Sequence, residues 1–368
     1  MTIEGRATAE GTAAYRDRFT GKLSPEHFRF IDDLVVGTIG IGTYLGPHNE
    51  ETDADYRGAL VEALKTGCNH LDTAINYRCM RSEKIIGRTL EILSDEGRIA
   101  RNEVILCTKG GYVPFDGEAP KNIRRFIRES YVEPGIVEED DLVGGCHAMT
   151  PRFLETQITR SLENLRARTI DIYYLHNPEV HRAVLPRGAF LDRMKRAFAF
   201  LEEEAAVGRI ARYGVSSWEA FRAEPSSPVH ISLEDLVKIA RKVAGENHHF
   251  AAVQLPFNIA MMEGFALAGQ EVEGMPLSAV DAAARLGVAM TFSAPFLQGR
   301  LLRQFPDLLA RGLKDIDSNA KKAIQFARSI PGVASVLVGM SKDVHVAENL
   351  SLARKPPLSM DELAVLFE

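Results

Sequence analysis

The chain has 368 residues, of which 45% are hydrophobic and 26% charged, and its formal net charge is -6. This composition is typical of a globular protein and excludes a largely disordered chain, and the length suffices for one large core or two modest ones. Acidic and basic residues are interspersed without a basic stripe, and no apolar run approaches the roughly 20 residues that cross a bilayer, so we expect neither a nucleic-acid partner nor a membrane span.

The start of the chain and the cysteines indicate the compartment. The first residues are polar and lack the apolar segment of a secretion signal. Cys68, Cys79, Cys107 and Cys146 show no CxxC spacing, so we expect reduced thiols and no metal site. These features predict a cytoplasmic protein.

Eight β-rich runs recur along the chain, and helical patterns separate most of them. The predicted strands lie in residues 34–46, 68–74, 103–111, 170–178, 212–218, 250–257, 287–296 and 334–340. The predicted helices lie in residues 53–67, 150–167, 190–208, 233–245 and 318–332, the second with Thr150 as N-cap and Pro151 at its first position. This alternation favours a (β/α)8 TIM barrel with long loop insertions at the C-terminal face, and a doubly wound sheet is the alternative.

We expect three parts in the chain. Residues 1–32 form an N-terminal extension, residues 33–352 the (β/α)8 barrel catalytic domain, and residues 353–368 a C-terminal tail. Two connections, residues 111–149 and 258–275, exceed ordinary barrel loops and are either functional lids or decoration. His147, in the first of them, is a candidate for the substrate pocket.

Polar side chains stand at the C-terminal ends of six predicted strands. A barrel brings these ends to one face, where active sites are built. We therefore expect one site from Asp72, Lys109, His176, Ser216, Gln254 and Ser293.

Asp72 and Tyr77 lie five residues apart where the second strand gives way to a loop. A tyrosine has an ordinary pKa of about 10, so proton transfer near neutrality requires a neighbour that lowers it. Lys109 can be that neighbour, and Asp72 can keep the lysine charged. His176 can donate a hydrogen bond to a substrate oxygen. The four residues make a proton-transfer device suited to polarising a carbonyl.

Several motifs then occur in a fixed order between about residues 33 and 352. They are "DTAINY" with "RSEKIIG", "CTK", "YYLHNP", "YGVSSW", "VQLPFN", "FSAPFLQGRL" and "GMSKDVHVAENL". As a set they resemble the aldo-keto reductases. The resemblance implies an oxidoreductase that uses NADPH to reduce an aldehyde or ketone to an alcohol, or the reverse, with a small-molecule substrate and Tyr77 as general acid or base.

Residue by residue, the resemblance implies a catalytic tetrad of Asp72, Tyr77, Lys109 and His176. It also implies that Ser216 and Gln254 hold the nicotinamide amide, with Ser217 where the family often has asparagine, and that Phe292 stacks on the nicotinamide ring. The remaining cofactor residues would be Ser293, Pro295, Phe296, Gly299 and Arg300 at the pyrophosphate, and Gly339, Ser341, Lys342, His345, Glu348 and Asn349 at the adenosine end.

The sequence also departs from the family pattern. "FSAPFLQG" is one residue longer than the common motif, which leaves open whether Ser293 or Ala294 faces the cofactor. His345 stands where many members have an arginine for the 2′-phosphate of NADPH.

Two other functions remain open on the same fold. Lys109 could be the nucleophile of a Schiff-base aldolase, or the chain could be a cofactor-sensing regulatory subunit that binds a partner. A Rossmann dehydrogenase is disfavoured, because no G-x-G-x-x-G follows a strand. No motif points to a particular oligomeric state.

Overall fold

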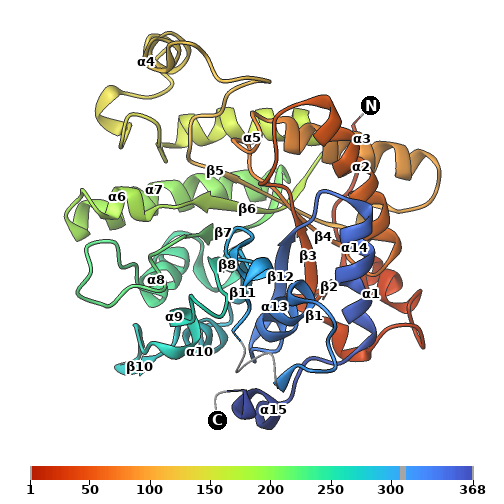
Figure 1. Ribbon diagram of the computed structural model, residues 1–368. Helices are drawn as coiled ribbons and strands as arrows, with labels where there is room; N and C mark the ends of the chain where they lie inside the picture. Colours follow the sequence, from red (N-terminus) through yellow and green to blue (C-terminus); the bar gives the residue numbers. More distant parts are fainter. Residues whose placement is uncertain (1, 307–311, 367–368) are drawn as a thin grey trace.

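The computed structural model describes residues 2–306 and 312–366. Eight parallel strands close into a barrel in the order β11-β12-β3-β4-β5-β6-β7-β8, and helices surround it (Figure 1). This confirms the predicted (β/α)8 barrel over the doubly wound sheet. The barrel strands are β3 (Ile39–Gly42), β4 (His70–Asp72), β5 (Ile105–Gly110), β6 (Ile170–His176), β7 (Ile210–Ser216), β8 (Phe250–Pro256), β11 (Ala289–Ser293) and β12 (Val333–Gly339).

The helices cover the outside of the barrel and its connections. Within the described residues the α-helices are α1 (Ala9–Asp17), α2 (Glu50–Lys65), α3 (Arg81–Asp95), α4 (Ile123–Ile127), α5 (Pro151–Leu165), α6 (Glu179–Arg182), α7 (Arg187–Ala206), α8 (Leu233–Ala244), α9 (Glu263–Ala266), α10 (Ala279–Arg285), α11 (Arg300–Arg303), α13 (Asn319–Arg328), α14 (Asp343–Leu350) and α15 (Met360–Val365). Short turns of 3-10 or π-helix are η1 (Pro25–His27), η2 (Arg101–Glu103), η3 (Arg128–Val132), η4 (Glu139–Asp141), η5 (Gly245–Asn247) and η6 (Ser351–Arg354). None of the helices in the described ranges is both long and apolar enough to span a bilayer.

The predicted strand at residues 34–46 is in fact two elements. Its first part, β2 (Leu34–Gly37), pairs antiparallel with β1 (Phe28–Ile31), and only its second part is the barrel strand β3. Thr38 separates them, and its backbone N–H donates to the carbonyl of His27 at 2.7 Å. A Cβ on Gly37 would lie 2.7 Å from the carbonyl oxygen of Gly67, so this crossing requires glycine.

The two long connections have structure of their own. Residues 111–149 carry α4, which stands away from the barrel in Figure 1, and bury a small apolar cluster against α5 that includes Val113, Ile127, Val137, Ala148 and Phe153. The 258–275 connection carries α9 and leads into a two-stranded ribbon, β9 (Gln270–Val272) with β10 (Met275–Leu277).

The barrel interior is packed with side chains from alternate positions of its strands. Ile105, Cys107, Ile172, Tyr174 and Ala252 form a buried cluster there, as expected for an interior filled in layers. The pocket described below opens at the C-terminal end of this packed interior.

Candidate active site

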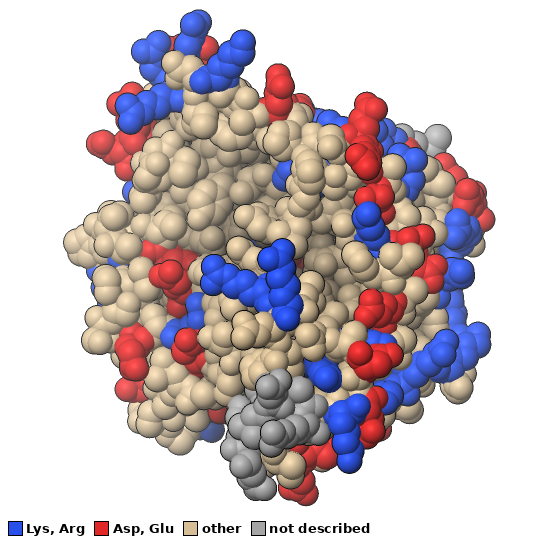
Figure 2. Space-filling model, viewed as in Figure 1, with Lys and Arg blue, Asp and Glu red and all other residues tan. Residues whose placement is uncertain are grey.

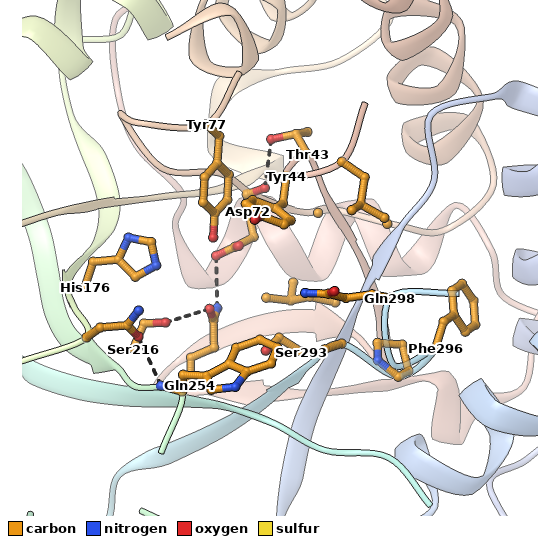
Figure 3. A pocket seen from close by; sticks show the side chains of 18 of the residues that line it. Thr43, Tyr44, Asp72, Tyr77, His176, Ser216, Gln254, Ser293, Phe296 and Gln298 are labelled. Atoms are coloured by element: carbon orange, nitrogen blue, oxygen red, sulfur yellow. Dashed lines mark hydrogen bonds between the residues drawn. The ribbon is translucent and has the colours of Figure 1, made fainter. Parts of the chain in front are cut away.

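The C-terminal ends of the barrel strands bring five of the six predicted strand-end residues around one pocket. Asp72, His176, Ser216, Gln254 and Ser293 line it, and Figure 3 shows these side chains with Tyr77 around the opening. Uncharged side chains surround the central hollow in Figure 2, with a small group of basic side chains beside it.

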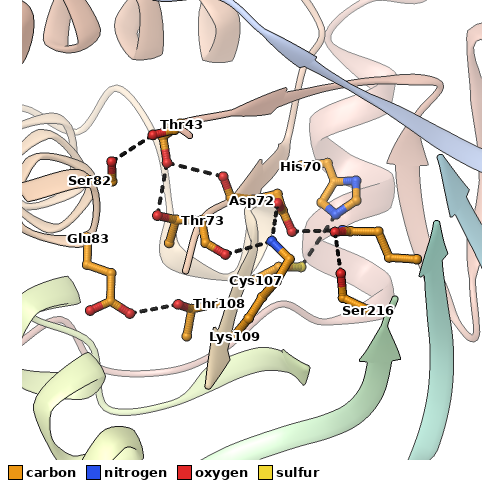
Figure 4. Close-up of polar contacts among 11 residues, drawn as sticks. Thr43, His70, Asp72, Thr73, Ser82, Glu83, Cys107, Thr108, Lys109 and Ser216 are labelled. Carbon is orange, nitrogen blue, oxygen red and sulfur yellow. Dashed lines mark hydrogen bonds and ion pairs between the residues drawn. The ribbon is translucent and has the colours of Figure 1, made fainter. Parts of the chain in front are cut away.

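Lys109, the sixth residue, lies directly beneath this pocket and is fully buried. Its Nζ donates to Oδ1 of Asp72 at 2.5 Å and to the carbonyl of Thr73 at 2.8 Å (Figure 4). A buried charge is costly unless it is paired and hydrogen-bonded. Both conditions hold for this lysine, so the ammonium is fixed in one orientation.

The second oxygen of Asp72 continues the network across the barrel. Nε2 of Gln254 donates to Oδ2 of Asp72 at 3.0 Å, and the hydroxyl of Ser216 donates to Oε1 of Gln254 at 2.9 Å. With Lys109, the network links four barrel strands, and it determines the orientation of the Gln254 amide at the pocket wall.

Tyr77 lies in the loop after β4 and stands over this network. Its ring centre is 5.1 Å from Nζ of Lys109 and 5.8 Å from the ring of His176. The ring of Tyr44 packs edge-on against it at 5.0 Å. The structure thus brings Asp72, Tyr77, Lys109 and His176 together, although residues 72 and 176 are far apart in sequence.

The electrostatics differ in one respect from the sequence-based expectation. Burial raises the pKa of Tyr77 above its ordinary value, and the opposing effect of Lys109 is smaller. Burial would by itself lower the pKa of Lys109, but Asp72 and Tyr77 outweigh it, so the pKa of this lysine is raised. At neutral pH the pair therefore consists of a protonated phenol beside a charged ammonium.

The side chain of His176 is neutral for the same physical reason. Burial, and then the positive charge of Lys109, holds the pKa of His176 well below its ordinary value. Its Nδ1 atom is buried without a hydrogen-bond partner among the described residues. A neutral imidazole donates through one nitrogen and accepts through the other, so His176 can bind a carbonyl oxygen without a proton transfer of its own.

A series of hydrogen bonds ends at the backbone carbonyl of His176. The sequence analysis did not predict it. The guanidinium of Arg193 contacts Nδ1 of His181 at 2.7 Å, Nε2 of His181 contacts Nδ1 of His147 at 2.8 Å, and Nε2 of His147 contacts the carbonyl of His176 at 2.6 Å. Arginine only donates and a carbonyl only accepts, so every link donates toward His176. His147 thus supports the backbone of His176 and is absent from the residues that line the pocket.

Both intermediate histidines remain uncharged, which the direction of this chain requires. Burial lowers the pKa of His147 to about 4 and that of His181 to about 3. These hydrogen bonds connect the 111–149 insertion to the strand end that carries His176.

The predicted cofactor residues fall into two groups. Ser216, Ser217, Gln254, Ser293, Pro295, Phe296, Gly299 and Gly339 line the pocket. The other predicted residues lie outside its lining: Arg300 begins α11, Ser341 and Lys342 precede α14, and His345, Glu348 and Asn349 lie within α14. Asn349 is buried, and its Oδ1 has no partner among the described residues.

The predicted stacking role of Phe292 is contradicted by the structure. Thr291 is in register with Gln254, whose side chain faces the barrel interior. Because side chains alternate along a strand, Phe292 points outward. It is fully buried and stacks on Phe257, with ring centres 4.2 Å apart. Ser293 and Ala294 both line the pocket, so the wall at this point carries small side chains instead of an aromatic ring.

Other pocket residues were missed by the sequence analysis. Most of them end or follow β3, β6 and β7 or lie in the loop after β11, and Leu337 lies within β12. Their proximity in sequence to predicted residues was the available signal. The missed residues are Gly42, Thr43, Tyr44, Leu45, Asn177, Trp218, Gln298 and Leu337.

Known proteins resemble this chain in sequence and in fold. An uncharacterized oxidoreductase of Bacillus subtilis, YqkF, is 22% identical over 338 residues, which cover 91% of this chain and 92% of that protein. The NADH-specific methylglyoxal reductase of Escherichia coli is 25% identical over 193 residues, 51% of this chain and 50% of that protein. An aldo/keto reductase from Klebsiella pneumoniae, solved with NADP and acetate, superposes with a TM-score of 0.61 at 19% identity, covering 93% of this chain and 94% of that one.

The comparison with protein families is more specific. The model of the Aldo/keto reductase family matches residues 33–259, which include Asp72, Tyr77, Lys109, His176 and Gln254. The sequence motifs, the closed barrel and this match agree, and the chain belongs to the aldo/keto reductase family of oxidoreductases.

Proposed function

We propose that this protein is an NADPH-dependent reductase of an aldehyde or ketone, acting in either direction, with Tyr77 as the general acid or base. The observation that carries the proposal is the position of Tyr77. It lies over the Lys109–Asp72 ion pair and beside His176 at the rim of an open pocket.

The pocket fits a nicotinamide cofactor. It extends from Tyr77 and His176 past Gln254 and Ser293 to the glycines at positions 299 and 339. The fixed amide of Gln254 and the Ser216 hydroxyl offer hydrogen bonds to a carboxamide, and small side chains at 293 and 294 leave room for a flat ring. When bound, NADPH supplies the hydride.

The residues of this chain supply the proton and the polarisation. Tyr77 donates its phenolic proton to the carbonyl oxygen, and the Lys109 ammonium stabilises the phenolate that remains. Asp72 keeps the ammonium oriented, and neutral His176 donates a hydrogen bond that holds the carbonyl oxygen near the tyrosine. The raised pKa of Tyr77 keeps the phenol protonated at neutral pH, so it is ready to act as an acid.

NADPH is proposed over NADH because of the residues near the start of α14. Lys342 is the N-cap residue of this helix, and a cation together with helix N-terminal amides favours a phosphate group. The Klebsiella neighbour was solved with NADP, whereas the Escherichia coli relative is described as NADH-specific. Titration of this protein with both cofactors tests the preference.

The two alternatives have less support. A Schiff-base nucleophile needs a neutral amine, whereas the pKa of Lys109 is raised and the amine is locked to Asp72. A sensing subunit does not need Tyr77, Lys109, Asp72 and His176 assembled around an open pocket.

The proposal is tested by following the loss of NADPH absorbance with purified protein and a panel of aldehydes and ketones. The reverse reaction is followed by the appearance of NADPH absorbance with NADP and the matching alcohols. We expect turnover with at least one carbonyl. Binding of NADPH without any turnover would favour the sensing subunit, and a substrate trapped on Lys109 by borohydride would favour the aldolase.

A further inference from the structure

Three consecutive residues directly after Tyr77 adopt left-handed backbone conformations. Arg78, Cys79 and Met80 have φ angles of 48°, 54° and 64°. A residue with a Cβ rarely visits this region, and then usually as a single residue. A run of three persists only where the surrounding contacts determine it, and such strained segments cluster at functional sites.

The side chain of Arg78 provides these contacts. It is buried, and it extends away from the pocket toward the start of α2. Its Nε donates to the carbonyl of Pro47 at 2.9 Å, one terminal nitrogen donates to Oδ1 of Asp53 at 2.6 Å, and the guanidinium lies 5.1 Å from the ring centre of Tyr56.

Asp53 also contacts the other side of the turn, through Arg81. We call Arg78, Asp53 and Arg81 the clamp. Oδ2 of Asp53 accepts from Nε of Arg81 at 3.0 Å, and Arg81 is the first residue of α3. One carboxylate on α2 therefore holds an arginine at each end of the left-handed run. Charge-assisted hydrogen bonds of this kind are stronger than hydrogen bonds between neutral groups.

The three backbone carbonyls of the turn also accept hydrogen bonds. The carbonyl of Arg78 accepts from the N–H of Arg81 at 3.1 Å, that of Cys79 from Gly117 at 3.0 Å, and that of Met80 from Lys84 at 3.2 Å. Gly117 belongs to the long insertion, so the turn is held from α2, α3 and the insertion at once.

The clamp also reaches the neighbouring loop, which follows β3 and carries Tyr44. Pro47, which accepts from Arg78, lies three residues after Tyr44, and the ring of Tyr44 packs edge-on against Tyr77. Arg78 therefore ties together the two loops that carry the two tyrosines.

We propose that Arg78 is a positioning residue, which holds the left-handed turn at residues 78–80 and thereby sets Tyr77 over Lys109 for proton transfer. The inference rests on the proposed reductase function. Its physical basis is that Tyr77 is covalently joined to the turn, so relaxation of the turn toward ordinary backbone angles moves the phenol relative to Lys109.

The test is a cycle of variants in the full-length protein. Arg78→Ala should lower kcat by about 10–100-fold, the loss expected when a reacting group is misplaced by about 1 Å. It should change the NADPH dissociation constant by no more than about twofold, since no clamp residue lines the cofactor end of the pocket. Adding Cys79→Gly and Met80→Gly should restore part of kcat, because glycine adopts the left-handed turn without a clamp.

Arg212→Ala is the matched control. Arg212 also bridges two carboxylates, at 2.8 Å to Asp32 and in contact with Asp33, but it lies at the opposite end of the barrel. We expect its kcat to equal that of the wild type. If Arg78→Ala does not fold, Asp53→Asn weakens the same clamp while keeping a hydrogen-bond acceptor, and should lower kcat in the same way.

The outcomes separate the two proposals. A wild-type protein without activity on any carbonyl would contradict the proposed function. Thermal unfolding then tests the clamp alone. The two glycine substitutions should raise the Tm of the wild type more than that of Arg78→Ala, because the turn has already relaxed in Arg78→Ala. Three results would overturn the role of Arg78. The first is an active wild type with unchanged kcat in Arg78→Ala, and the second is a loss of kcat that the glycine substitutions do not repair. The third is an equal gain in Tm from the glycines in both backgrounds.

Discussion

Each end of the barrel holds a buried ion pair, and the two pairs have different partners. Near the N-terminal ends of the strands, Arg101 contacts Asp171 at 2.7 Å, with side chains 5% and 0% exposed. At the C-terminal ends, Lys109 contacts Asp72 at 2.5 Å, with side chains 0% and 5% exposed. Distance and burial alone do not distinguish these two pairs.

The first pair is surrounded by main-chain groups. Asp171 accepts from the backbone N–H groups of Ala7 and Leu106, both at 2.7 Å. Arg101 donates to the carbonyls of Val104 and Thr169 at 2.7 and 2.9 Å. These contacts fasten the N-terminal segment to strands β5 and β6, which is a structural role.

The second pair also has one main-chain partner, the carbonyl of Thr73, but its other neighbours are side chains at an open pocket. Asp72 accepts from Gln254, and Lys109 lies beneath the ring of Tyr77. Side chains can exchange protons with a bound molecule, whereas main-chain groups cannot. The comparison teaches that a buried ion pair indicates a functional site only when titratable side chains and a cavity adjoin it.

The largest effect on turnover is expected at the C-terminal end of the barrel, where the pocket opens. Tyr77→Phe removes only the hydroxyl, so kcat should fall by about 10²–10⁴-fold, the contribution of a general acid. The NADPH dissociation constant should stay near the wild-type value, since the ring remains. Steady-state kinetics and a fluorescence titration measure the two quantities. Near-normal kcat would remove Tyr77 from the mechanism, and loss of cofactor binding would make its role structural.

The equivalent change at the other end should affect stability instead of turnover. Arg101→Ala leaves the buried Asp171 without its charge partner and should lower the free energy of unfolding by roughly 3–5 kcal/mol. The kcat of the folded enzyme should not change. Denaturant unfolding followed by active-site-normalised kinetics checks both, and a selective loss of kcat would contradict the contrast between the two ends.

Asp72→Asn tests the separate contributions of the two residues in the Lys109–Asp72 pair. The amide keeps a hydrogen bond to Lys109 but removes the charge that orients the ammonium, so kcat should fall less than in Lys109→Met, which should abolish reduction at neutral pH. The order of the two kcat values is the measurement. An equal or larger loss in Asp72→Asn would give the carboxylate a direct part in the reaction.

The smallest effect is expected at an exposed cation remote from both pairs. Lys342→Ala should weaken NADPH binding by about 1–3 kcal/mol, the range for hydrogen bonds to charged groups, and leave NADH binding almost unchanged. Titrations with both cofactors measure the difference. If the two cofactors lose affinity equally, or neither does, the 2′-phosphate is bound elsewhere.

Local patterns in the sequence determined the fold class and grouped Tyr77 with the three residues that surround it in the structure. Alternating strands and helices specify a barrel, and a barrel necessarily brings its strand ends together. Asp72, Lys109 and His176 could therefore be grouped from their places in three separate motifs, without any knowledge of their contacts.

Tertiary structure decided what depends on register and on distant contacts. The side on which Phe292 lies follows from its pairing with β8, because a shift of one residue exchanges the two faces of a strand. The left-handed turn after Tyr77 exists because Arg78 finds Asp53 and Pro47, and His147 supports His176 because the insertion folds back onto β6. Local sequence leaves such contacts undetermined, since each is made between residues that only the folded chain brings together.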